Sequence, residues 1–168
     1  KKSYFSYGIE YLNNKVKSTA SLNNIANGTF SSIATRYPDD STWESLASYL
    51  TYKYKSSKDL IFHYGLRYSH IIINADLSPN NSYYNFPFSN ADLNTGALTG
   101  ALGLSWIQND SFQWKFNVTT AFRAPNIDDI GKIFDSAPGM VVVPNPDLKP
   151  EKSLGLELVN FYEPWDKV

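Results

Sequence analysis

The chain has 168 residues, a formal net charge of −1 and no cysteine. Its length suffices for one domain with a hydrophobic core, its balanced charge gives no overall attraction to nucleic acid or to an anionic membrane surface, and the lack of cysteine excludes disulfides, cysteine-based zinc sites and a cysteine nucleophile. Aromatic residues make up 15% of the chain, which favours a β protein with many interfacial side chains.

Bulky apolar residues alternate with polar residues in six long segments, and this pattern predicts six strands. The predicted strands cover residues 4–16, 43–55, 59–73, 95–107, 112–123 and about 152–162. In the fifth strand, for example, Trp114 and Phe116 lie on one face while Lys115 and Asn117 lie on the other. Each strand therefore has one apolar face and one polar face.

The connections between these strands alternate between long and short. Residues 18–42, 74–94 and 124–151 form long connections, whereas 56–58 and 108–110 form tight turns. All long loops then lie at one end of the sheet. The strands have about 11 to 14 residues, which suits a tilted crossing of a bilayer better than an ordinary globular sheet. We therefore expect an all-β, antiparallel up-and-down meander of about six strands that belongs to a larger transmembrane β-barrel.

Hydropathy does not decide whether the chain is soluble. The mean hydropathy is −0.35 and no apolar run is long enough for a transmembrane helix. A transmembrane strand, however, shows only one apolar face, so its average hydropathy is unremarkable.

Charged residues and a histidine lie on the face opposite the apolar band. They are Glu10, His63, Arg67, Lys115, Arg123 and Glu157. Charges of both signs are costly in lipid, so we expect this face to line a lumen filled by water or by protein. Barrels with a plugged lumen have about 22 strands, so six strands would form about a quarter of the wall.

Two motifs flank the last long connection. In the first, Pro125 ends the strand and Asn126 is a good helix N-cap. Asp128 and Asp129 would fall in the first helical turn, where negative charge is favourable. These residues predict one short helix from Ile127 to about Phe134. In the second, three prolines within 144–150 predict a stiff corner. A purely structural role, in which both motifs only shape a loop, is the main interpretation from the residues alone.

The order of the motifs resembles a known family. Phe122-Arg123-Ala124-Pro125-Asn126, an excursion of about twenty residues, and then Asn145-Pro146-Asp147-Leu148-Lys149-Pro150-Glu151 resemble the C-terminal half of a TonB-dependent outer-membrane receptor. The resemblance implies that residues 1–168 are part of a barrel domain in the outer membrane of a Gram-negative bacterium. It also implies that a plug domain and a segment that contacts TonB lie upstream of Lys1.

The same resemblance implies a function without an active site. Receptors of this family take up a scarce, bulky nutrient with energy that TonB delivers by pulling on the plug, and the motif pair favours the iron-siderophore, haem or cobalamin branch over the glycan-importing branch. Ligands contact the exterior loops. The candidate ligand-binding residues of this chain are therefore Arg36, Tyr37, Tyr83, Tyr84, Phe86, Phe88, Phe134 and Met140.

Other interpretations of single residues are simpler. His63 and His70 are an odd number of residues apart on one strand, so they lie on opposite faces and cannot bind one metal ion or haem together. The pairs Asp39-Asp40 and Asp128-Asp129 are better explained by loop solvation or helix capping than by catalysis. We therefore expect no enzyme activity, no metal site and no cofactor.

Two rival folds make different predictions. A soluble, aromatic-rich β-sandwich that binds carbohydrate would have shorter strands and a buried inner face. A small outer-membrane enzyme on an eight-stranded barrel would need two more strands and a convergent polar triad. Under the leading interpretation, an isolated six-stranded piece has open edges and a bare apolar face, so it should self-associate edge to edge or need detergent. Residues 164–168 are typical of a turn that enters another strand.

Overall fold

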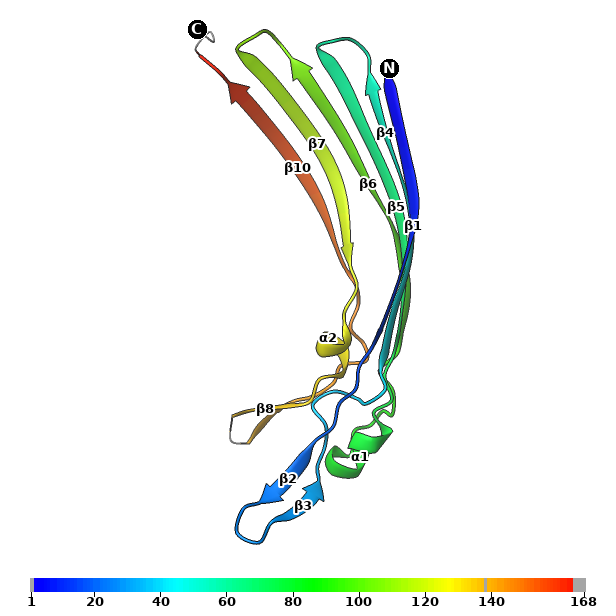
Figure 1. Cartoon of the computed structure of the whole chain (residues 1–168), viewed down its shortest axis with the longest axis vertical. Coiled ribbons are helices and arrows are strands. Elements are labelled where there is room, and N and C mark those ends of the chain that lie inside the picture. Colours follow the sequence, from blue (N-terminus) through cyan, green and yellow to red (C-terminus); the bar gives the residue numbers. More distant parts are fainter. Residues whose placement is uncertain (1, 138, 165–168) are drawn as a thin grey trace.

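The computed structural model describes residues 2–137 and 139–164. Six long strands form one antiparallel sheet in the order β1-β4-β5-β6-β7-β10, with neighbouring long strands consecutive along the chain (Figure 1). These strands are β1 (Ser3–Lys15), β4 (Thr42–Lys55), β5 (Leu60–Asn74), β6 (Leu93–Ile107), β7 (Phe112–Arg123) and β10 (Glu151–Tyr162). The predicted meander is confirmed. Residues 165–168, which were predicted to enter a further strand, lie outside the described part of the chain.

The long connections carry small elements of their own at one end of the sheet (Figure 1). They contain the hairpin of β2 (Ser21–Asn24) and β3 (Thr29–Ser32), the helix α1 (Ser78–Tyr84), the helix α2 (Ile127–Gly131), and the hairpin of β8 (Phe134–Ala137) and β9 (Met140–Val142). Both additional sheets are two-stranded. The described residues therefore form no second layer of a sandwich, and the carbohydrate-binding sandwich is wrong as a fold.

Two details of the helix prediction are also wrong. The helix predicted to reach Phe134 ends at Gly131, because Lys132 is extended and the backbone N–H of Ile133 donates to the carbonyl of Arg36 at 2.8 Å instead of continuing the helical pattern. A second helix, α1, was missed. Pro79 sits in its first turn, and its N-cap residue Leu77 makes no side-chain capping bond, so the usual start signal is lacking.

The sheet has an apolar outer face and a polar inner face. On β5, Phe62, Tyr64 and Leu66 lie on the outer face, and Arg67 lies on the inner face with Glu10. The outer face is not covered: Leu98 is 63% exposed and Leu156 is 76% exposed. The prediction that this face remains outside the core is confirmed, since Phe112, Trp114 and Phe116 are not among the buried core residues.

The outer face has the dimensions of a membrane-spanning band. Outward-facing residues continue along β5 from Leu60 to His70. This stretch corresponds to about 33 Å of strand, or roughly 25 Å along the membrane normal at a tilt of about 40°, which matches the apolar band of outer-membrane barrels. At the turn end of this band, Trp106 and Trp114 are paired across β6 and β7, where an aromatic girdle is expected.

The ladder between β6 and β7 stops before either strand ends. The two strands pair from Ile107–Gln113 as far as Ala101–Thr119. Beyond that point β6 remains paired with β5 and β7 remains paired with β10. Where the ladder ends, the side-chain Oγ1 of Thr120 accepts the backbone N–H of Gly100 at 2.8 Å. The sheet therefore has two arms, β1-β4-β5-β6 and β7-β10, which separate toward the long loops (Figure 1).

A pair of arginine substitutions at matched depth tests the sidedness of the sheet. Leu102 points to the outer face, and Thr51 points to the inner face one residue row away. If the outer face contacts lipid, Leu102→Arg lowers the free energy of unfolding by about 2–4 kcal/mol, whereas Thr51→Arg changes it by less than about 1 kcal/mol. Denaturant unfolding of the complete barrel from lipid vesicles measures both values. Equal effects at the two positions would contradict the assignment of faces.

Candidate functional site

The three long connections meet in one small hydrophobic core. We name them the first loop (residues 16–41), the second loop (75–92) and the third loop (124–150). The core contains Ile71 and Ile73 from β5, Ala75, Leu77 and Ala91 from the second loop, and Ile127 and Ile130 from α2 in the third loop. Val16 and Tyr37 of the first loop pack against it. The loops are therefore positioned by contacts among themselves and with the inner face of β5.

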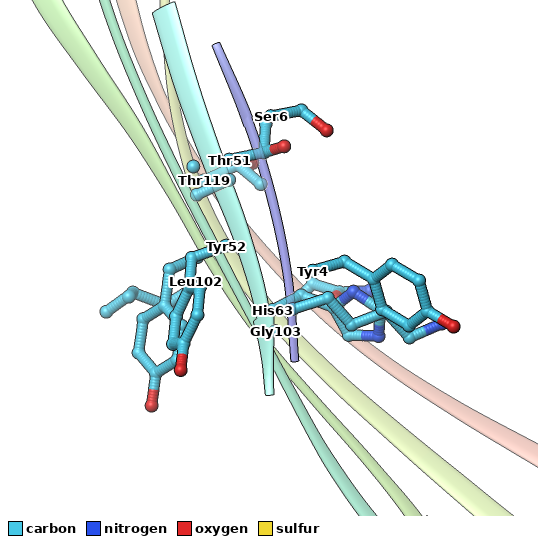
Figure 2. Close-up of a pocket in the computed structure, with 13 residues that line it drawn as sticks. Tyr4, Ser6, Thr51, Tyr52, His63, Leu102, Gly103 and Thr119 are labelled. Atoms are coloured by element: carbon cyan, nitrogen blue, oxygen red, sulfur yellow. The ribbon is translucent and has the colours of Figure 1, made fainter. Parts of the chain in front are cut away.

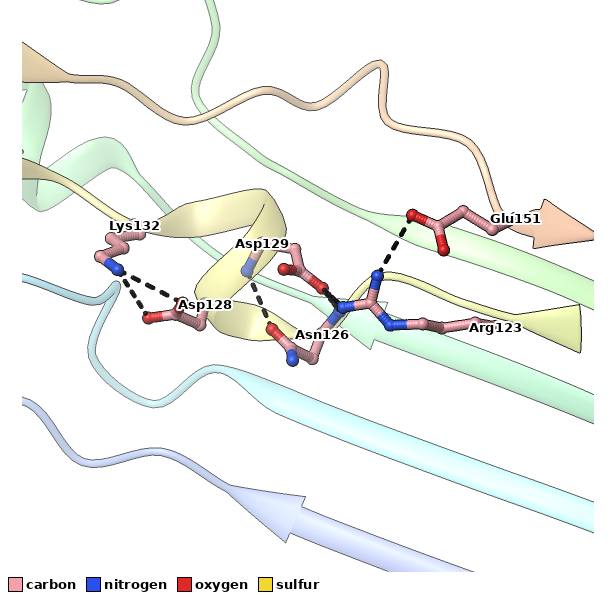
Figure 3. A network of polar contacts seen from close by, with 6 residues as sticks. All are labelled: Arg123, Asn126, Asp128, Asp129, Lys132 and Glu151. Carbon is pink, nitrogen blue, oxygen red and sulfur yellow. Dashed lines mark hydrogen bonds and ion pairs between the residues drawn. The ribbon is translucent and has the colours of Figure 1, made fainter.

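Arg123 joins the two sequence motifs at the base of the third loop (Figure 3). Asn126 caps α2 as predicted: its Oδ1 accepts the N–H of Asp129 at 2.9 Å, and its own N–H donates to Asp129 Oδ2 at 3.1 Å. The guanidinium of Arg123 donates to Asp129 Oδ2 at 2.9 Å and to Glu151 Oε1 at 3.2 Å. The Arg123 side chain thus ties the start of the loop to its end, and both motifs have a structural role.

Three predicted ligand-binding residues come together from two loops. The Cζ atom of Arg36 lies 4.6 Å from the ring centroid of Phe134 and 5.6 Å from that of Tyr37. Lys132 Nζ lies 5.8 Å from the same Phe134 ring, at the distance of a cation–π contact. The Tyr37 hydroxyl donates to Asp128 Oδ1 at 2.7 Å. We call Arg36, Tyr37, Asp128, Lys132 and Phe134 the cationic–aromatic cluster.

Hydrogen bonding in this cluster perturbs the titration of Asp128. The hydroxyl of Tyr37 donates to its carboxylate, and Lys132 and Arg36 add positive charge nearby, so the pKa of Asp128 falls below its ordinary value of 3.8. The carboxylate therefore remains charged over the physiological pH range.

A pocket of about 420 Å³ opens beside this cluster. It is lined by Asn14, Val16, Tyr37, Trp43, Asn126, Ile127 and Asp128. Asn14 and Trp43 are register partners across β1 and β4 on the inner face, and α2 supplies the opposite wall. We call it the loop pocket. Tyr37 is the single predicted ligand residue among its lining residues.

Asn14, Val16 and Trp43 were predicted only as strand residues and not as part of a site. A signal was nevertheless present, because Trp43 has the strand parity of the polar face and a large indole there is unusual for a solvated wall. Asn126 and Asp128 were assigned to helix capping, which the structure confirms for Asn126.

The predicted aromatic residues of the second loop form a separate group. The rings of Tyr84, Phe86 and Phe88 are stacked, with centroids 5.5 Å apart at each step. Phe88 also packs against the hydrophobic core where the three loops meet, whereas Tyr83 is exposed. Met140 lies on β9 and is 64% exposed. The structure thus does not bring all eight predicted residues into one site.

Five of the six predicted lumen residues, namely Glu10, His63, Arg67, Lys115 and Glu157, share the inner face. Arg67 donates to Glu10 Oε1 at 2.6 Å, and Asn117 donates to Glu157 Oε2 at 2.7 Å. Lys115 Nζ lies 4.5 Å from the ring centroid of Phe161. Only Arg123 departs from the wall, because its side chain belongs to the base of the third loop.

His63 lines a shallow hollow of about 440 Å³ on this inner face. Figure 2 shows Tyr4 and His63 on one side of the strands, and Tyr52 and Leu102 on the other. His63 is opposite Lys53 and Gly103 in the ladder, whereas His70 is opposite Leu46 and Gly96. The prediction that the two histidines lie on opposite faces is confirmed.

The described residues contain no group of three or more His, Cys, Asp or Glu side chains placed to hold a metal ion. None of the helices in this part of the chain is long and apolar enough to cross a membrane.

Removal of the Tyr37 hydroxyl tests the contact in the cationic–aromatic cluster. In Tyr37→Phe the pKa of Asp128 should rise toward 3.8, because its largest stabilising hydrogen bond is lost. In the wild type, a lowered pKa means that the contact stabilises the folded loop above pH 3.8 and is lost as the pH falls through the folded value. Carboxyl carbon NMR titration measures the shift, with Tyr83→Phe as the control. An unchanged Asp128 titration in Tyr37→Phe would show that this contact is not made.

Comparison with known proteins agrees with this architecture. A search of curated sequences finds no match. Among solved structures, the copper transporter OprC superposes with a TM-score of 0.76 at 14% identity, over 97% of this chain and 25% of that one. The chain thus spans about a quarter of the length of that structure. The family model for the β-barrel of TonB-dependent receptors matches residues 2–162. This chain belongs to the TonB-dependent receptor β-barrel family, whose members are outer-membrane transporters of Gram-negative bacteria rather than enzymes.

Proposed function

We propose that this chain is part of the wall and exterior vestibule of a receptor that imports a scarce, bulky nutrient across the outer membrane. The observation that carries the proposal is the sidedness of a six-stranded sheet whose apolar outer face is exposed and whose inner face holds charges of both signs. Such a sheet is suited to separate lipid from a polar lumen. The long loops then face the cell exterior, and the tight turns face the periplasm.

The inner face would contact the receptor's own plug domain. Glu10, His63, Arg67, Lys115 and Glu157 offer groups of both charges to a protein surface in the lumen. We assign residues 1–168 to a partial barrel domain, and the contact with TonB to an N-terminal segment outside this chain. The edges of β1 and β10 would pair with further strands of the same barrel. Isolated from those strands, the piece would self-associate edge to edge.

The exterior loops would contact the ligand. The cationic–aromatic cluster presents a guanidinium and an ammonium beside aromatic rings, and the loop pocket provides an apolar recess next to it. Arg36, Tyr37 and Phe134 are the first candidates, followed by the stacked Tyr84, Phe86 and Phe88, then Tyr83 and Met140. A planar or anionic bulky nutrient of the iron-siderophore, haem or cobalamin type fits these surfaces. The likeness to OprC concerns the fold alone, so its copper is not carried over.

Uptake in cells tests the proposed function. The receptor that carries this chain is expressed in a strain lacking its other receptors, and uptake of labelled ferric siderophores, haem and cobalamin is compared with and without TonB. One of these ligands should accumulate only when TonB is present, while its binding to the cell surface persists without TonB. Accumulation that is independent of TonB, or lacking for all three classes, would contradict the proposal.

Substitution of Arg36 tests the ligand-binding role of the loops. Arg36→Ala removes an exposed cation of the first loop, and we expect a ligand affinity about 3- to 30-fold weaker, which corresponds to about 0.6–2 kcal/mol for one cation–π or charge-assisted contact with the ligand. Equilibrium binding of the transported ligand to whole cells measures the change. Ile25→Ala is the matched control, since Ile25 lies on the same loop and is 95% exposed. Equal affinities in Arg36→Ala and in the control would exclude Arg36 from the binding site.

A further inference from the structure

We infer that the three exterior loops fold cooperatively into one cap. The cap holds the two arms of the sheet, β1-β4-β5-β6 and β7-β10, together beyond the point where β6 and β7 cease to pair. The cap consists of the first, second and third loops as defined above. The exterior position of the cap rests on the proposed function, but its cohesion does not depend on which nutrient the receptor carries.

The cap is needed because the ladder between β6 and β7 does not join the two arms at the loop end of the sheet. Beyond Ala101 and Thr119, β6 and β7 do not pair with each other. The Thr120 hydroxyl, which accepts the N–H of Gly100 and lies 3.5 Å from its carbonyl oxygen, ends the ladder. Above this point the arms are joined by side-chain packing between the loops and the ends of the strands rather than by the ladder.

The hydrophobic core supplies that attachment. Ile127 and Ile130 lie on α2, which follows β7, and they cluster with Ile71 and Ile73 on β5. Ile130 and Ile73 are fully buried. A core residue of this kind contributes to stability only while both arms remain together, because its apolar surface is otherwise returned to water.

Hydrogen bonds join the first loop to both of the others. The backbone N–H of Ile133 in the third loop donates to the carbonyl of Arg36 at 2.8 Å. The side chain of Asn80 in the second loop is 3% exposed, and its amide donates to the carbonyl of Thr35 at 3.0 Å. The Thr35 hydroxyl in turn lies 3.2 Å from Asn80 Oδ1. A buried amide that loses these partners is costly, so the first and second loops are held together.

These contacts make the loops interdependent. Each loop contains groups that are buried or bonded only when another loop is in place, so local opening of one loop should release the others. Opening of the cap would then separate Tyr37 of the first loop from Ile127 of the third loop, and so disrupt the loop pocket that both residues line.

Proteolysis of intact cells that display the receptor tests the cap. Ile130→Asn places a polar side chain in the shared core, and Ile25→Asn on the exposed β2–β3 hairpin is its control. We expect Ile130→Asn to raise the rate of chymotrypsin cleavage at Tyr83 and Tyr84 in the second loop, and of trypsin cleavage at Arg36 in the first, by at least about tenfold. The control should change these rates by less than about twofold.

A second variant distinguishes opening of the loops from a failure of the barrel to assemble. Asn80→Ala leaves the isoleucines intact, and it should raise trypsin cleavage at Lys132 in the third loop, a residue with no direct hydrogen bond to Asn80 among those described. A disulfide between Thr35→Cys and Asn80→Cys should restore protection of the first and second loops in the Ile130→Asn background. Cleavage that increases only in the substituted loop, in either single variant, would overturn the inference and show that the loops open independently.

Discussion

The structure depends on the antiparallel ladder, which fixes both the register and the faces of the strands. Because side chains alternate with a period of two, one register decides which residues face lipid and which face the lumen. Glu10 and Arg67 meet at 2.6 Å on the inner face only because β1, β4 and β5 hold their register over their full lengths. A slip by one residue would place these charges in the membrane.

The loops stabilise the sheet where the ladder between β6 and β7 ends. Between β6 and β7, backbone pairing stops at Ala101 and Thr119, and side-chain packing under the loops takes over. The gap begins at Ala101, which pairs with Gly65 midway along the outward-facing stretch from Leu60 to His70. Unpaired backbone groups are costly in lipid, so protein must cover this gap. The loop core and the Arg123 contacts lie at this end of the sheet. The same contacts that hold the wall together there also shape the loop pocket and position Arg36 over Phe134.

Local patterns were sufficient to predict the wall. Alternation predicted all six long strands to within about two residues, and the residues around Asn126 predicted its capping role, because both signals depend on neighbours along the chain. Contacts between distant segments could not be predicted in this way. Arg36 and Phe134 are far apart in sequence, and their meeting depends on a core built from three loops. The early end of α2 has the same cause, since the N–H of Ile133 bonds to the first loop.

The most direct test of the account is the environment of successive side chains along β5. Single cysteines at positions 62 to 67, in the receptor reconstituted in lipid vesicles, would carry a polarity-sensitive fluorophore, and brominated lipids would quench those in contact with acyl chains. This chain has no cysteine of its own, so each label within it is unique. If this sheet is a membrane wall, the labels at Phe62, Tyr64 and Leu66 are quenched and those at His63, Gly65 and Arg67 are not. Uniform quenching, or none at any position, would contradict the assignment of this sheet as a membrane wall.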